Sequence, residues 1–263
     1  MTFNIISDIH VLPTRYNYHK NYNVNNFGSF MPEKLLPADY LLIAGDLGIG
    51  SNYLSVYDEI VERTCGKFKQ VFFVRGNHDY WSVDNPFNKD HQFVEVELDE
   101  NTVLLGCTLW TPIKEYRPNG QLKWHFSEEY LVHHYMNDFR LIKNFSIKKH
   151  NARYAEESVW LHDKCKQYAN KKIVIMTHHG PRAELISPTY SKSTINAAYF
   201  VTDKSCDDLN PTLWIYGHTH HQSDIIINNT RYVNNAVGYH DVDRYMFVPE
   251  CNVTTWYNKI VEI

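Results

Sequence analysis

Short apolar runs rich in isoleucine, valine, leucine and phenylalanine recur along the chain. Each run leads into a polar cluster that contains glycine, aspartate, asparagine or histidine. Such runs are typical of strands that are buried on both faces of a sheet. We therefore predict strands at residues 3–6, 40–44, 71–74, 173–176 and 213–216.

Segments with helical spacing of apolar residues separate these strands. They predict helices over 52–65, 128–145 and 152–169, and Ser127 is placed to cap the second of them. Strands that alternate with helices are typical of parallel β-α-β units. The later segments 225–227, 231–234 and 253–257 have no helix between them, which predicts an antiparallel hairpin and edge strands. The chain shows no repeat or linker, so we expect one α/β domain over residues 1–263.

Composition narrows the classes of partner. The 263 residues are 43% hydrophobic and 21% charged, as in ordinary globular proteins. The net charge of −4 leaves a nucleic-acid partner open but does not indicate one. No apolar run approaches the ~18 residues of a membrane span, and the five cysteines form no Cys-x-x-Cys pair. We expect a cytoplasmic protein with reduced thiols and no membrane contact.

The polar clusters follow the predicted strands, and ligands of parallel sheets bind beyond the carboxyl ends of strands. Parallel strands would therefore bring all the clusters to one edge. Residues two apart on an extended backbone point the same way, which is what we expect of Asp8 with His10 and of His218 with His220. The side chains that could converge are Asp8, His10, Asp46, Asn77, His178, His218 and His220.

This set offers only oxygen and nitrogen donors, which suit manganese, iron or zinc. Seven donors are too many for one tetrahedral ion, and they suit two ions that share a bridging carboxylate. Such a pair keeps a small positive charge, which favours an anionic phosphate, and clamps the oxygens of a displacement at phosphorus. We expect two divalent ions, with Mn²⁺ first and Fe, Zn, Ni or Co as alternatives.

The ordered motifs DIH, GDLG, GNHD, a single histidine and GHTH span residues 8–220. This set resembles the calcineurin-like metallophosphoesterase superfamily. The resemblance implies a four-layered α/β sandwich, with two central mixed β-sheets flanked by helices. It assigns to the first ion Asp8, His10, Asp46 and His220. It assigns to the second ion Asp46, Asn77, His178 and His218. Asp46 would bridge the ions, and His78 would contact the phosphate and act as general acid.

Other features place the chain within that superfamily. Leu47-Gly48 follows Asp46, where protein Ser/Thr phosphatases have the longer GDxVDRG, and Asp8 stands where lariat-debranching relatives have cysteine. The segments 106–110 (GCTLW), 136–140 (MNDFR) and 177–181 (THHGP) resemble a group of small bacterial and phage metallophosphoesterases. Val237 stands where that group leads us to expect an arginine.

Several further residues have two interpretations. His179 is a predicted substrate contact, or else a hydrogen-bonded loop residue. Asp79 is predicted to orient a ligand histidine, or else to cap the segment after it. Asn137 and Arg140 are predicted substrate contacts. Arg75 would touch phosphate or form a surface ion pair.

These observations predict metal-dependent hydrolysis of a phosphomonoester or phosphodiester. A hydroxide bridging the two ions would attack phosphorus while His78 protonates the leaving oxygen. We expect a small, nucleotide-like phosphorylated substrate. The alternatives are a non-catalytic metal-binding interaction module on the same scaffold and a nuclease acting on nucleic-acid ends.

Overall fold

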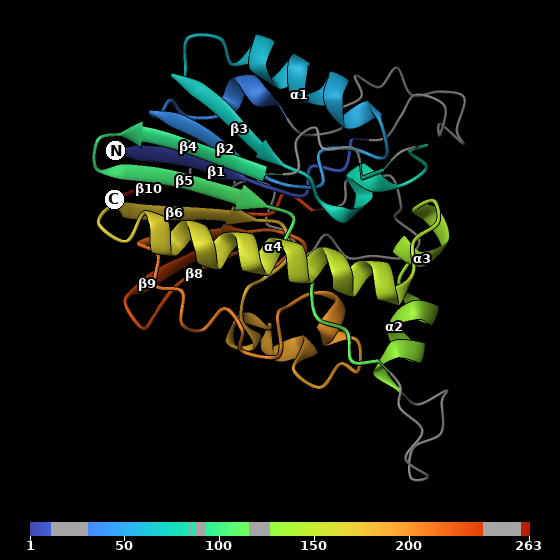
Figure 1. Cartoon of the computed structure of the whole chain (residues 1–263). Coiled ribbons are helices and arrows are strands. Elements are labelled where there is room, and N and C mark those ends of the chain that lie inside the picture. Colours follow the sequence, from blue (N-terminus) through green and yellow to red (C-terminus); the bar gives the residue numbers. More distant parts are fainter. Residues whose placement is uncertain (12–30, 85, 88–92, 116–126, 239–258) are drawn as a thin grey trace, which may run out of the picture.

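The computed structural model describes residues 1–11, 31–84, 86–87, 93–115, 127–238 and 259–263 (Figure 1). Its strands form two sheets. The first sheet contains, in spatial order, β10 (Ile260–Glu262), β1 (Thr2–Ile6), β2 (Tyr40–Ala44) and β3 (Gln70–Val74). The second contains β4 (Phe93–Asp99), β5 (Thr102–Cys107), β6 (Lys172–Thr177), β7 (Leu213–Tyr216), β9 (Thr230–Asn234) and β8 (Ser223–Ile227).

Helices connect and cover these strands. The α-helices are α1 (Asn52–Arg63), α2 (Glu128–Tyr135), α3 (Asp138–Leu141) and α4 (Ile147–Gln167). Short 3₁₀ turns are η2 (Pro32–Lys34), η3 (Asn77–Tyr80), η5 (Ala183–Leu185), η6 (Pro188–Tyr190) and η7 (Asn196–Ala198). Within the described residues, no helix combines the length and apolar character needed to cross a membrane.

The inner strands of both sheets run parallel. Strands β1, β2 and β3 are parallel to one another, as are β5, β6, β7 and β9. Antiparallel pairs occur at the sheet edges, where β10, β4 and β8 lie. All the strands predicted from the apolar runs are present, with ends shifted by at most one residue. The carboxyl ends of the parallel strands therefore lie at one edge, as the position of the polar clusters requires (Figure 1).

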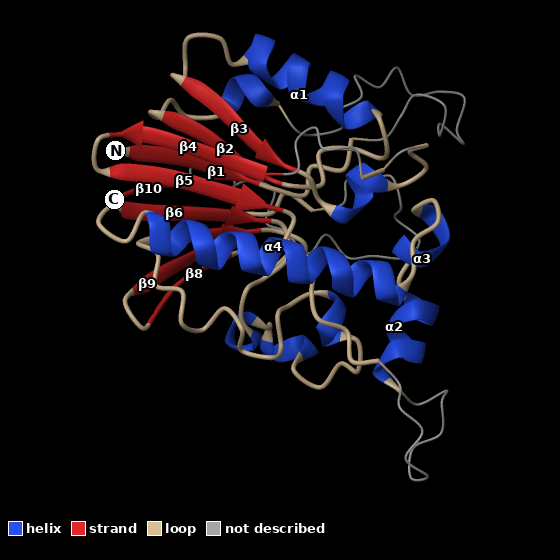
Figure 2. Ribbon diagram, viewed as in Figure 1, coloured by secondary structure: helices blue, strands red, loops and turns tan. Residues whose placement is uncertain are grey.

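The strands alternate their side chains between two cores. Leu42 and Ala44 of β2 pack in a cluster with residues of the second sheet, whereas Leu41 and Ile43 pack in a cluster with α1. On the far side, Ile175 of β6 shares a third cluster with residues of α4. The layers are thus helix, sheet, sheet and helix, which confirms the sandwich predicted from the resemblance (Figure 2).

Three predictions need correction. The helix expected over 128–145 is divided into α2 and α3, because Met136 takes an extended conformation and buries its side chain. Helix α4 begins at Ile147 rather than 152, with Ser146 accepting a hydrogen bond from the Lys149 amide. Strands β4 and β5 were not predicted. Strand β4 alternates charged and half-buried positions as a sheet edge does, whereas β5 is buried throughout.

The predicted antiparallel hairpin is confirmed as β8 and β9. Asn228 and Asn229 form its turn and both have positive φ angles, of 49° and 68°. Two left-handed residues are what a tight two-residue hairpin turn needs, and asparagine tolerates this conformation well. The strand expected at 253–257 lies outside the described residues.

A buried glutamate on α4 supports the turn that follows β5. Glu157 is fully buried, and its Oε2 accepts a hydrogen bond of 2.8 Å from the Trp110 amide. The neighbouring Leu109 has a φ of 52°, and the Thr108 carbonyl accepts hydrogen bonds from the amides that follow β6. Burial raises the pKa of Glu157 to about 8, so the carboxyl is protonated in the folded protein at neutral pH.

We predict that this carboxyl makes stability fall as pH rises from about 5 to 8. Its folded pKa lies above its ordinary value, so the stabilisation is fully present below that ordinary value and is lost on rising through the folded pKa. Each pKa unit of difference corresponds to about 1.4 kcal/mol. Chemical unfolding of Glu157→Gln should show a flatter dependence on pH than the unchanged protein. Parallel pH curves for the two proteins would contradict this.

Gly45, which follows β2, lies close to residues of both sheets' loops. Its φ is 88°, and a Cβ there would lie 2.3 Å from His178 Nδ1 and 2.8 Å from the Gly76 Cα. Gly66 has a similar φ of 79° but has open space around its Cα. The two positions therefore share the backbone conformation and differ in packing.

We predict that Gly45→Ala destabilises the protein more than Gly66→Ala does. Left-handed backbone strain should lower the free energy of unfolding by about 1–2 kcal/mol in both variants. Overpacking against His178 should add about 1–3 kcal/mol in Gly45→Ala alone. Urea unfolding of both variants measures the difference, and equal losses would show that the close approach carries no energetic weight.

Candidate metal centre

The predicted site residues follow the parallel strands directly. Asp8 follows β1, Asp46 follows β2, Asn77 and His78 lie on η3 after β3, and His178 follows β6. All seven side chains predicted as metal ligands are buried, with exposed fractions between 0% and 8%. The expectation that distant strand ends bring these residues together therefore agrees with the fold.

Strained backbone is concentrated among these residues. Positive φ angles occur at Asp8 (54°), His10 (51°), Asp46 (55°), His218 (67°) and His220 (48°). Left-handed conformations are uncommon outside glycine, and they persist where surrounding contacts enforce them, often at functional sites. Here the Asp8 amide donates to the Gly45 carbonyl and the His10 amide to the Asp46 carbonyl, each at 3.0 Å.

The donor atoms form connected groups that could each hold a metal ion. Two of these groups are Asp8 with His10 and His220, and Asp46 with His178 and His218. In the first, His220 Nε2 lies 3.4 Å from Asp8 Oδ1 and 2.9 Å from His10 Nε2. Two ligands about 2.1 Å from a common ion are separated by roughly 3.0–3.4 Å, so these distances fit a cation between the donors.

The second group centres on His178. Its Nε2 lies 3.0 Å from Asn77 Oδ1, 3.2 Å from His218 Nδ1 and 3.4 Å from Asp46 Oδ2. Its Nδ1 lies 2.9 Å from the Ala44 carbonyl oxygen, which accepts hydrogen bonds and cannot donate them. The ring therefore carries a proton on Nδ1, and its Nε2 faces the other donors.

Asp46 connects the two groups. Its Oδ2 lies 3.4 Å from His178 Nε2, 3.7 Å from His10 Nε2 and 4.0 Å from His78 Nε2. Its Oδ1 accepts a hydrogen bond of 2.9 Å from the His78 amide. A single carboxylate oxygen thus faces nitrogen donors of both groups, as a bridging ligand would.

Burial and charge shift the pKa values of this cluster. Burial lowers the pKa of His10 and of His218 well below the ordinary histidine value, and neighbouring histidines lower both further. Burial also lowers the pKa of His78, to about 4. Burial acts on His178 in the same direction, but the Asp46 carboxylate outweighs it and raises that pKa to about 9. Neutral imidazoles are the form that binds metal ions.

Asp79 fastens the loops of the site to each other. Its carboxylate accepts hydrogen bonds from the amides of Asp46 at 2.9 Å, Gly76 at 2.8 Å and Gly48 at 3.1 Å. These described partners are backbone amides rather than the histidine ring that we predicted. The side chain therefore positions the loop that carries Asp46.

The remaining predicted residues lie around the cluster. His179 is buried, with its Nδ1 3.3 Å from the Thr108 carbonyl and its ring centroid 4.4 Å from that of His218. Asn137 and Arg140 are exposed and hydrogen-bonded to each other. Arg75 is buried, whereas a surface ion pair was one of its two predicted roles, and its guanidinium lies over the ring of Tyr53.

Asp138 was missed by the sequence reasoning. It is buried, and its Oδ1 accepts a hydrogen bond of 2.8 Å from Asn77 Nδ2. The sequence feature that could have identified it is its place in the MNDFR segment, between the predicted substrate contacts Asn137 and Arg140.

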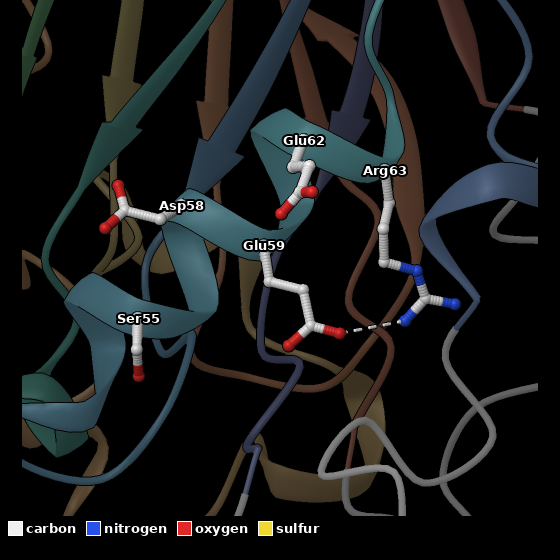
Figure 3. A pocket seen from close by; sticks show the side chains of 5 residues that line it. All are labelled: Ser55, Asp58, Glu59, Glu62 and Arg63. Carbon is white, nitrogen blue, oxygen red and sulfur yellow. Dashed lines mark hydrogen bonds and ion pairs between the residues drawn. The ribbon is translucent and has the colours of Figure 1, made fainter.

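A hollow on the outer face of α1 contains none of the predicted site residues. Its lining is Ser55, Asp58, Glu59, Glu62 and Arg63 (Figure 3). Arg63 forms ion pairs with Glu59, at 3.2 Å, and with Glu33, at 2.5 Å. This is the charged, solvated face of a helix whose other side packs on the first sheet.

Comparison with known proteins adds independent findings. An uncharacterized protein, L509 of Acanthamoeba polyphaga mimivirus, is 26% identical over 237 residues, covering 76% of this chain and 78% of the viral protein. The phosphopantetheinyl hydrolase of Mycobacterium tuberculosis has a structure with a TM-score of 0.60 at 17% identity, covering 92% of this chain and 91% of its own. A dimetal phosphatase from Danio rerio has a TM-score of 0.48 at 12% identity, covering 89% and 86%.

The likeness to the mycobacterial structure concerns the fold alone, since its sequence identity is low. The family model described as calcineurin-like phosphoesterase matches residues 1–222, which is most of the chain. The match includes every motif from DIH to GHTH. The chain therefore belongs to the calcineurin-like phosphoesterase family.

Proposed function

We propose that this protein hydrolyses a phosphoester using two divalent metal ions. The observation that carries the proposal is the position of Asp46 Oδ2, within 4.0 Å of ring nitrogens of His10, His78 and His178. These four residues follow four different strands, three in the first sheet and one in the second. Family membership supports metal-dependent phosphoester hydrolysis as the reaction class.

We propose the ligand sets that the sequence predicted. The first ion takes Asp8, His10, Asp46 and His220. The second ion takes Asp46, Asn77, His178 and His218. The donors are hard oxygens and imidazoles, so we propose Mn²⁺ first, with Fe, Zn, Ni or Co as alternatives. When bound, the ions supply Lewis-acid charge for phosphoryl oxygens and lower the pKa of a water that can attack phosphorus.

His78 is the proposed general acid. Its ring is stacked on Trp81 with centroids 3.5 Å apart, and its Nε2 lies 4.0 Å from Asp46 Oδ2. The stacking fixes the plane of the imidazole, so that a ring nitrogen can meet the leaving oxygen of a substrate. The negative charge of a bound phosphate favours the protonated form of the ring, whereas burial and the positive charge of the ions oppose it.

We propose a small phosphorylated substrate. The net charge of −4 gives no general attraction for a polyanion, so it favours a small phosphate over a long nucleic acid. Asn137, which precedes α3, and Arg140, within α3, are exposed and are the proposed contacts for its organic part. A substrate screen should cover nucleotides, sugar phosphates and phosphopantetheinyl esters, the last because of the name of the mycobacterial hydrolase.

We predict that activity requires both the ions and the bridging carboxylate. Manganese-loaded protein should hydrolyse p-nitrophenyl phosphate or its bis-ester. A chelator should abolish this activity and added Mn²⁺ should restore it. Asp46→Ala should reduce turnover to the buffer blank, while Asp58→Ala, an exposed carboxylate on α1, should keep full activity. Full turnover by Asp46→Ala would refute the bridging role.

We predict that the effect of His78→Gln depends on the leaving group. A general acid contributes about 10²–10⁴-fold when the leaving oxygen is a poor one. The variant should therefore lose activity by this amount on an alkyl phosphate such as a nucleoside 5′-monophosphate. The loss should be at least tenfold smaller on p-nitrophenyl phosphate, whose phenolate departs without a proton.

The matched control for this variant is His134→Gln, which changes an exposed histidine of α2. Its activity on both esters should equal that of the unchanged protein. If His78→Gln lost the same factor on both substrates, the residue would act in another way than by proton donation.

A further inference from the structure

One carboxylate oxygen joins α3 to both ends of η3. Asp138 Oδ1 accepts hydrogen bonds from Asn77 Nδ2 at 2.8 Å and from Trp81 Nε1 at 2.7 Å. Asp138 has an exposed fraction of 4%, so these bonds lie in an environment where a lost partner is costly. Helix α3 lies on the side toward which the arrowheads of β3 and β6 point (Figure 1).

The bond to Asn77 decides which end of its amide faces the candidate metal centre. The amide has an acceptor oxygen and a donor nitrogen, and only the oxygen can bind a cation. With Nδ2 held by Asp138, Oδ1 points toward His178 Nε2, 3.0 Å away. Rotation of the amide by half a turn would place the donor nitrogen against both a cation and its other ligands.

The bond to Trp81 keeps the carboxylate itself in place. The indole nitrogen is a donor only, and it occupies the same oxygen that serves Asn77. The Trp81 ring is buried and stacked on His78, so it has little freedom to move. The acceptor for Asn77 is therefore a fixed group and not a mobile side chain.

We propose that Asp138 is the positioning residue that holds the Asn77 amide oxygen toward the second metal ion. The proposal rests on the proposed function, since it concerns one ligand of the proposed pair of ions. Among the described residues, Asp138 is not part of the donor groups that could hold an ion, so its effect passes through Asn77. Partners that orient a metal ligand in this way typically contribute about 10–100-fold to metal affinity.

The first test is a titration of the metal-free protein with Mn²⁺. Calorimetry and electron paramagnetic resonance measure the number of ions bound and their affinities. The unchanged protein should bind two equivalents. Asp138→Ala should bind the first ion normally and the second about 10–100-fold more weakly. Asp138→Asn keeps an oxygen acceptor and should stay within a few-fold of the unchanged protein. Lys143→Ala, an exposed change just after α3, is the matched control and should bind both ions normally.

The second test exchanges the acid and the amide. Asn77→Asp places two carboxylates face to face, and the second ion should bind at least about tenfold more weakly. Trp81 Nε1 donates to the same carboxylate oxygen and would oppose an amide nitrogen there, so the exchange is made in Trp81→Phe protein. In that background, adding Asp138→Asn supplies an amide donor to the new carboxylate and should restore most of that affinity. The two substitutions should therefore be strongly non-additive. This cycle remains informative if Asp138→Ala does not fold, which circular dichroism of each variant checks.

The outcomes separate this inference from the proposed function. If the unchanged protein binds fewer than two manganese ions, the proposed function fails and the inference fails with it. If it binds two, and Asp138→Ala also binds two with unchanged affinity, the inference alone is overturned. The orienting role would also be overturned if Asp138→Asn weakened binding of the second ion as much as Asp138→Ala does. Additive effects of the two substitutions in the exchange would overturn it as well.

Discussion

The structure depends on burying two carboxylates, Asp8 and Asp46, at the edge where two sheets meet. Their exposed fractions are 0% and 1%, and buried charge is unfavourable unless opposite charge or hydrogen bonds compensate it. Amide hydrogen bonds supply part of the compensation, from His218 to Asp8 and from His78 to Asp46. The His178 ring beside Asp46 supplies another part, since the Asp46 carboxylate raises the pKa of that ring. Divalent cations would meet the same need with more charge.

The framework around the cluster offsets the strain of its backbone. Left-handed conformations at non-glycine residues are unfavourable by about 1–3 kcal/mol each, and several occur together here. The apolar cluster between the sheets holds the strand ends in register, and Asp79 ties three backbone amides together across the loops. Rigid strands thus position short polar loops, which is how a sheet edge can hold many donors at fixed separations.

Patterns that are local in sequence predicted the inner strands and the convergence of the polar clusters at their ends. The inner strands were found because each is an apolar run that stops at a polar cluster, and convergence of the clusters followed from parallel pairing. Features that depend on distant partners were not predictable. Asp138 contacts Asn77, 61 residues away, and no spacing rule connects them. The partners of Asp79 and the break after Tyr135 were missed for the same reason, since tertiary contacts decide both.

The order of the donors along the chain has a consequence for synthesis. Asp8 and His220 lie 3.4 Å apart in space, but almost the whole chain separates them. A chain that ends before His178 contains one of the four histidines in the set, and it lacks β7, β9 and β8 of the second sheet. Loop closure over such a length comes late in folding. The complete donor set is therefore a property of the folded sheets, and no segment that is local in sequence contains it.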